Sequence, residues 1–161
     1  MLTDALGHHQ AGRLREAETL CRQILEANPD HPDALHLRGV LALQAGHGDE
    51  AIRFIERSVE LNPNNADALN NLGLAFTSLG RQVDAVAVYR KAIALVPDFA
   101  QAQSNLGDAF IAEGNPEEAI ACYEHVLESH PHEPQILNNL GNALASLGNL
   151  EDAIAHFRHA L

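Results

Sequence analysis

Apolar residues recur along the chain at helical spacing, in stripes interrupted by glycine. Between residues 66 and 99, one stripe precedes Gly80 and a second follows it. Spacings of three and four residues place each stripe on one face of an amphipathic helix. The pattern therefore predicts two helices joined by a turn at Gly80, the left-handed residue that ends the first helix. The first stripe is Ala68, Leu69, Leu72, Ala75, Phe76 and Leu79, and the second is Val83, Val86, Ala87, Tyr89, Ile93 and Leu95.

The same pair of helices returns with a period of 34 residues. The period is marked inside the first helices by Gly39, Gly73, Gly107 and Gly141, with Ala5 at the equivalent position before them. A turn glycine follows seven residues after each of these, and a proline closes each complete repeat. We predict one repeat array over residues 1–161, in which neighbouring repeats bury apolar surface between them. Its parts are a partial repeat at 1–31, full repeats at 32–65, 66–99 and 100–133, and a repeat at 134–161 that lacks its end and a capping helix.

Glycine inside a helix costs about 1 kcal/mol relative to alanine, so the glycines within the first helices need a packing reason. We expect a second helix to cross closely there. The small residues expected on the facing helix are Ala51, Ala85, Ala119 and Ala153. The second helices are predicted to begin at caps such as Asn115, followed by Pro116 and two acidic residues.

Leu-Gly, a turn glycine, alanine, an aromatic residue and proline at these offsets resemble the tetratricopeptide repeat over the whole chain. The aromatic position is filled by Cys21, Ile55, Tyr89, Tyr123 and Phe157. The resemblance implies an all-α fold, a right-handed α-α superhelix (solenoid) of antiparallel helix pairs. It also implies that the first helices line a concave groove where partners bind.

The groove face should carry the residues six, three and two positions before each of these glycines, and one, four and five positions after it. Asn71, Asn105 and Asn139 share one of these positions in three successive repeats. Their carboxamides offer a donor and an acceptor together, as an extended peptide backbone does. This row is similar to the asparagine ladder of O-GlcNAc transferases and their bacterial relatives. The candidate peptide-binding residues are Asp67, Asn70, Asn71, Gln101, Ser104, Asn105, Asp108, Asn138, Asn139 and Asn142.

First helices about 10 Å apart would present one asparagine to every third residue of an extended ligand, which rises roughly 3.3 Å per residue. Three such contacts supply about 3 kcal/mol, so binding through them would be weak and independent of the peptide sequence. The alternative interpretation is that these amides only bond neighbouring helices or follow the consensus of the repeat.

The formal charge of −12 disfavours nucleic-acid partners, which are bound through Lys and Arg. Asp33, Asp67 and Asp108 favour a neutral or basic extended segment over an acidic one. The groove face has no pair of cations for the dicarboxylate clamp that holds acidic chaperone tails. No apolar run predicts membrane insertion, and a cytoplasmic location is expected. Cys21 and Cys122 fall on apolar helix faces and are predicted to be buried thiols.

The chain has no recognisable catalytic motif, so no catalytic residue, cofactor or metal site is predicted. Its ten histidines form no set of four ligands on one face. The leading hypothesis is a non-catalytic scaffold that binds a peptide segment through the asparagine ladder. A second is the substrate-recruiting region of a larger enzyme such as an O-GlcNAc transferase-like glycosyltransferase. A third is self-assembly into a homo-oligomer through an apolar terminal face, formed by Leu150, Ala153, Ile154, Phe157 and Leu161.

Overall fold

The computed structural model describes residues 1–161 and contains ten α-helices and no strand. The prediction of an all-α chain is therefore confirmed. The chain forms two compact units, residues 1–81 (unit 1) and residues 82–161 (unit 2), with five helices in each. The division falls inside the predicted repeat 66–99, between its two helices. No helix combines the length and the hydropathy that a bilayer crossing requires.

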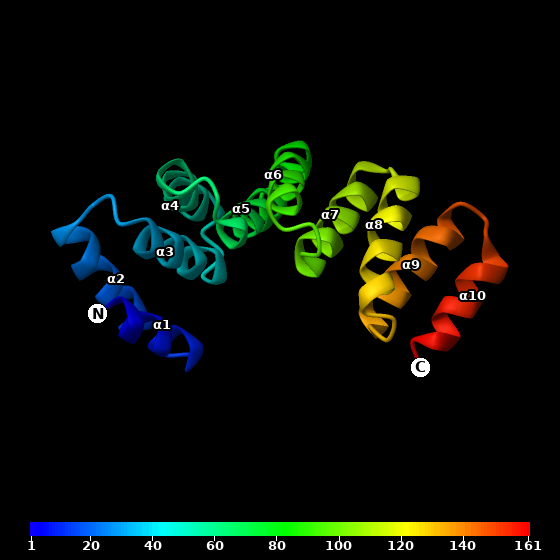
Figure 1. Cartoon of the computed structure of the whole chain (residues 1–161), viewed down its shortest axis with the longest axis horizontal. Coiled ribbons are helices and arrows are strands. Elements are labelled where there is room, and N and C mark those ends of the chain that lie inside the picture. Colours follow the sequence, from blue (N-terminus) through cyan, green and yellow to red (C-terminus); the bar gives the residue numbers. More distant parts are fainter. The chain divides into compact units, whose positions relative to one another are not determined.

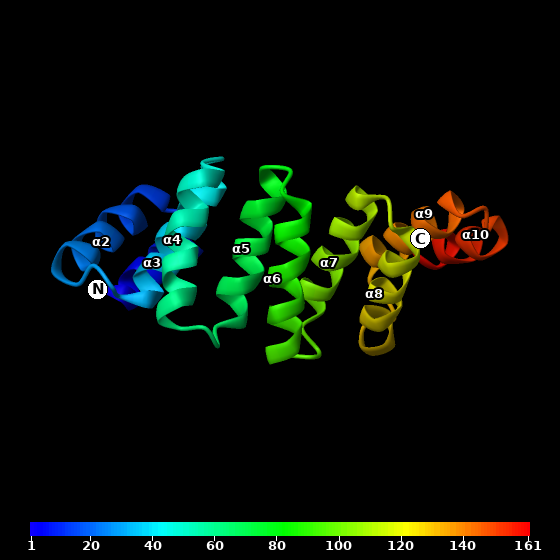
Figure 2. The ribbon, with the colours of Figure 1, turned by 90° about the horizontal axis from the view of Figure 1, so that it is seen from above.

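Unit 1 is built from helices that pack on their neighbours in chain order and run in alternating directions (Figures 1 and 2). The first helices of successive repeats also touch, since α3 contacts both α1 and α5. Its helices are α1 (Leu2–Gln10), α2 (Leu14–Ala27), α3 (Pro32–Gln44), α4 (Gly48–Leu61) and α5 (Ala66–Ser78).

Unit 2 repeats this arrangement, with each helix packed on the next and the two first helices α7 and α9 in contact. In Figure 1, α9 and α10 form the orange and red pair at the C-terminal end. The helices of unit 2 are α6 (Gln82–Leu95), α7 (Ala100–Glu113), α8 (Pro116–Ser129), α9 (Pro134–Ser146) and α10 (Leu150–His159).

The turns between paired helices confirm the prediction made for Gly80. Its φ is +72°, and the other four turn glycines have φ between +72° and +83°. This left-handed backbone is one that residues with a Cβ rarely adopt, so glycine ends each first helix here.

The helix starts differ from prediction in one respect. Pro116 and the two acids after it occupy the first turn of α8 as expected, but the Asn115 side chain makes no capping bond. Its amide instead lies 3.5 Å from Glu113 Oε2. Side-chain caps are found on first helices, where Asn65 Oδ1 accepts from the Ala68 N–H at 2.9 Å.

Three glycines inside the first helices, Gly39, Gly107 and Gly141, lie where another helix crosses closely, as predicted, and a bulky side chain faces each of them. A Cβ added to Gly107 would lie 2.6 Å from the ring of Tyr123 on α8. One added to Gly141 would lie 2.5 Å from the ring of Phe157 on α10. At Gly39 the obstacle is the side chain of Ile55. The atoms nearest to Gly107 and Gly141 therefore belong to the aromatic residue four positions after the alanine, and at Gly39 the carbonyl oxygen of Ala51 also lies 3.1 Å from the added Cβ.

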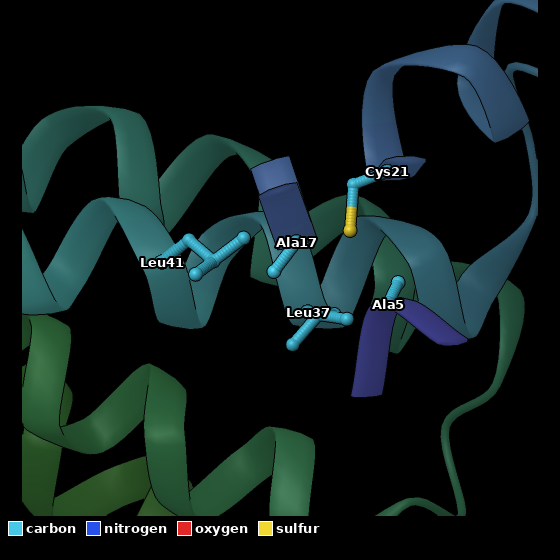
Figure 3. Close-up of a cluster of buried hydrophobic side chains, with 5 residues drawn as sticks. All are labelled: Ala5, Ala17, Cys21, Leu37 and Leu41. Atoms are coloured by element: carbon cyan, nitrogen blue, oxygen red, sulfur yellow. The ribbon is translucent and has the colours of Figure 1, made fainter. Parts of the chain in front are cut away.

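In the first repeat the same contact is made by smaller partners. Ala5 stands at the glycine position and Cys21 at the aromatic position, and both are fully buried. They share a cluster with Ala17, Leu37 and Leu41, in which the Cys21 sulfur points inward (Figure 3). A small thiol leaves room for the alanine methyl group that a tyrosine ring would exclude.

The apolar face predicted on α10 is smaller in the structure. Ala153 is buried and Phe157 is half-buried against Gly141, so both belong to the packing with α9. Leu150 and Ile154 remain exposed, at 59% and 48% of their surface, as does Leu161.

Replacing two helix-interior glycines by alanine should change stability in opposite directions. Gly107→Ala should lower the free energy of unfolding by about 1–3 kcal/mol, because the methyl group overlaps the Tyr123 ring. Gly7→Ala should raise it by about 0.5–1 kcal/mol, since no atom lies within 4 Å of the added group. Urea unfolding followed by circular dichroism measures both, and equal shifts in one direction would contradict the packing described.

Burial should also make both cysteines slow to react. It raises the pKa of Cys21 and of Cys122 to about 11, so little reactive thiolate is present at neutral pH. An aromatic disulfide reagent should modify both thiols slowly in the folded chain and rapidly in denaturant. Fast modification of the folded chain at neutral pH would show that one of these sites is open.

Candidate functional site

The unit 1 groove is a hollow of about 450 Å³ that α1, α3 and α5 line together. Every lining residue holds a position that the sequence assigned to the groove face, counted from Ala5, Gly39 or Gly73. The residues are Leu2, Leu6, His9, Asp33, His36, Leu37, Val40, Asp67 and Asn71. The periodicity of the sequence therefore identifies a real surface in this unit.

Asn71 is tied to a histidine in this groove. Its Nδ2 lies 2.9 Å from Nε2 of His36, so the amide donates when the ring nitrogen is unprotonated. Burial lowers the pKa of His36 below its ordinary value of 6.5, while Asp67 and Asp33 act in the opposite direction. The neutral ring that accepts from Asn71 is thus the form favoured at neutral pH.

The unit 2 groove is a hollow of about 500 Å³ lined by α7, α8 and α9. Three of the predicted binding residues, Asp108, Asn139 and Asn142, meet here. No basic side chain lines it, and Asp108 is its only charged residue. The other lining residues are Ile111, Gly114, Pro116, Tyr123, Ala143 and Ser146.

Asp108 is held by two hydrogen bonds from neighbouring helices. Its Oδ1 accepts from the Tyr123 hydroxyl at 2.7 Å and from Asn139 Nδ2 at 3.0 Å. Tyr123 is buried, and burial together with the bond to Asp108 raises the pKa of its hydroxyl. Tyr123 therefore remains a protonated donor well above neutral pH.

The two asparagines of the predicted row that lie in unit 2 have equivalent partners. Asn105 Oδ1 accepts from Gln101 Nε2 at 3.1 Å, and Asn139 Oδ1 accepts from Gln135 Nε2 at 3.3 Å. Each pair spans one helical turn, on α7 and on α9. Gln101 and Ser104 also line a separate hollow of about 420 Å³ beside Gln135.

Asn70 is the predicted residue whose placement differs. Its side chain is only 6% exposed, so the expectation that it lies on an open surface is wrong. At the equivalent position of later repeats Ser104 is half-buried and Asn138 is exposed. The period fixes the direction of a side chain, whereas neighbouring side chains decide how far it is covered.

Two residues of the grooves were missed by sequence reasoning. Tyr123 was named only as the aromatic residue of its repeat, although its hydroxyl distinguishes it from Ile55 and Phe157 at the same position. His36 stands three positions before Gly39, where the position rule would have found it. No three His, Cys, Asp or Glu side chains gather in a group suited to a metal ion.

Comparison with family models assigns the repeats. Models described as tetratricopeptide repeat match residues 8–75 and 104–161, and one described as TPR repeat matches residues 73–114. The chain is a tetratricopeptide repeat protein. Tetratricopeptide repeats are scaffolds for protein–protein interaction, and that is the broad function the assignment gives.

Solved tetratricopeptide repeat structures share this fold. A crystal structure of MamA is 24% identical, covering 97% of this chain and 91% of its own, with a TM-score of 0.89. Another MamA structure is 25% identical over 98% of this chain and 86% of its own, with a TM-score of 0.87. PilF from Pseudomonas aeruginosa is 21% identical over 99% of this chain and 72% of its own, with a TM-score of 0.89. A comparison with curated proteins gave no match.

Stability should depend on pH through His36. Because its pKa is lowered on folding, the unfolded chain takes up this proton first as the pH falls. The stability that folding gains from the neutral His36 ring is complete above pH 6.5, and it is lost as the pH falls through that value towards the pKa of the folded state. The free energy of unfolding, measured with urea at about pH 8 and about pH 5.5, should fall less between these two values in His36→Gln than in the wild type.

The exposed residue His130 provides the control for this measurement. The variant His130→Gln should lose as much stability on acidification as the wild type. A loss in His36→Gln that equals that of the wild type would mean that the neutral ring is not favoured by folding.

Proposed function

We propose that this chain is a non-catalytic scaffold that binds an extended segment of a partner protein along the polar face of its first helices. The family binds other proteins, and the proposal specifies the surface, which is the polar face of the first helices, and the ligand, which is an extended segment. The observation that carries it is the repeated glutamine–asparagine pair of unit 2, which orients two amides at equivalent positions of α7 and α9.

The Asn139 amide keeps hydrogen-bonding capacity for a ligand. A carboxamide has two donor hydrogens and can accept twice. Asn139 donates once to Asp108 and accepts once from Gln135. One donor and one acceptor remain, and these are the groups that a peptide unit of an extended backbone requires.

The helix spacing supports an extended ligand rather than a helical one. Neighbouring helices lie about 8–10 Å apart, and an extended chain covers roughly this distance in three residues. Asn105 and Asn139 would therefore contact peptide units three residues apart. A helix rises only about 1.5 Å per residue and has its peptide groups bonded internally.

The proposal predicts that removing both amides weakens peptide binding. Peptides selected from a phage-displayed random library on the full chain would serve as probes, with affinity measured by fluorescence anisotropy. The double variant Asn105→Ala/Asn139→Ala should bind about 30-fold more weakly, which corresponds to two amide contacts of about 1 kcal/mol each.

The exposed residue Asn64, in the turn between α4 and α5, provides the matched control. Asn64→Ala removes an amide from outside the proposed surface and should leave affinity unchanged. Wild-type affinity in the double variant would refute the ladder, and a failure to select any peptide would refute the scaffold proposal itself.

A further inference from the structure

We propose that the unit 2 groove is a receptor for a basic side chain, arginine or lysine, of the partner segment. The cationic group would bind the carboxylate of Asp108. This inference rests on the scaffold function proposed above and names the chemistry that its partner must carry.

Asp108 is arranged to accept a further donor. Both of its hydrogen bonds within the protein go to Oδ1, from the Tyr123 hydroxyl and from Asn139 Nδ2. Oδ2 therefore remains for a ligand. Because Tyr123 is buried and Asn139 is half-buried, the carboxylate is held in place before a ligand arrives, which lowers the ordering cost of binding.

The walls of the groove suit the stem of a long cationic side chain. Ile111 and Pro116 present apolar surface in the hollow that contains Asp108, and Ala143 lies on the α9 side. Lysine and arginine pack their methylene groups on such surface while the charged end reaches a polar group. The volume of about 500 Å³ lies in the range of small-molecule sites and is large enough for one such side chain.

The charge of the groove disfavours an acidic ligand. No Lys, Arg or His lines the groove, so the carboxylate is not neutralised by the protein. The chain as a whole carries a formal charge of −12, which attracts a cationic segment from a distance and repels an acidic one. The lining of the unit 1 groove differs, since it contains two histidines, His9 and His36, together with two aspartates.

The test compares peptides that differ at one residue. An extended peptide that binds the full chain would be synthesised with Arg, Lys, Gln or Glu at its central position. Wild type should bind the Arg and Lys peptides at least tenfold more tightly than the Gln peptide, the range of a hydrogen bond to a charged group. The Glu peptide should bind most weakly.

Asp108→Asn keeps the shape of the side chain and removes its charge, so it should abolish the preference for the Arg and Lys peptides over the Gln peptide. The control is Asp98→Asn, which removes the same charge from an exposed position in the α6–α7 turn and should preserve the preference. Asp108→Lys should reverse it and favour the Glu peptide. This second variant tests the same claim if Asp108→Asn is unstable.

The two proposals fail in different ways. Peptides that bind through Asn105 and Asn139 with no dependence on Asp108 would overturn the cation site and leave the scaffold proposal standing. A preference for Arg that persists in both Asp108 variants would place the cation elsewhere and overturn this inference. Absence of peptide binding to the wild type would overturn both proposals.

Discussion

The contact between a first-helix glycine and the bulky residue facing it on the second helix sets the geometry of these repeats. Gly107 lies under the Tyr123 ring and Gly141 under the Phe157 ring, at distances that leave no room for a Cβ. The first repeat reaches the same closeness by a different pairing, with Ala5 and the smaller Cys21 in one buried cluster. Because protein interiors are packed as densely as molecular crystals, the size of one partner constrains the size of the other. The unfavourable helix propensity of glycine is thus offset by close packing between helices.

This contact also positions the candidate site in unit 2. Asp108 follows Gly107 directly, so the ring that packs on the glycine ends with its hydroxyl 2.7 Å from the neighbouring carboxylate. Ile55 and Phe157 occupy the same repeat position but have no hydroxyl to donate. Tyr123 therefore packs in the helix interface and also bonds a residue of the groove, which Ile55 and Phe157 cannot do. Asn139 completes the arrangement from α9, which means that three helices determine where one carboxylate points.

The fold was predictable from the sequence because its signals are local and repeated. Turn glycines such as Gly80 mark helix ends through backbone conformation alone, and the 34-residue period identifies which positions line a groove, including Asp67 and Asn71. The errors concern choices that a period does not determine. The burial of Asn70 depends on the surrounding side chains. The Asn115 side chain bonds Glu113 instead of capping α8, and the local sequence is compatible with either arrangement. The hydrogen bond from Asn71 to His36 joins different helices, so no single repeat predicts it.

The hydrogen bonds inside the grooves bear on what a ligand can gain. Asn139 already bonds Asp108 and Gln135, so its amide is oriented but also partly satisfied by the protein. A new bond to a peptide then replaces one to water, with a net gain of about 1 kcal/mol for each amide. Such contacts fix the direction of a backbone without discriminating among sequences. Selectivity would have to come from other groups, and in unit 2 the proposed ones are the carboxylate of Asp108 and the apolar wall at Ile111. In the proposed mode of binding, the row of amides would hold a segment extended, and the unit 2 groove would select which segment is held.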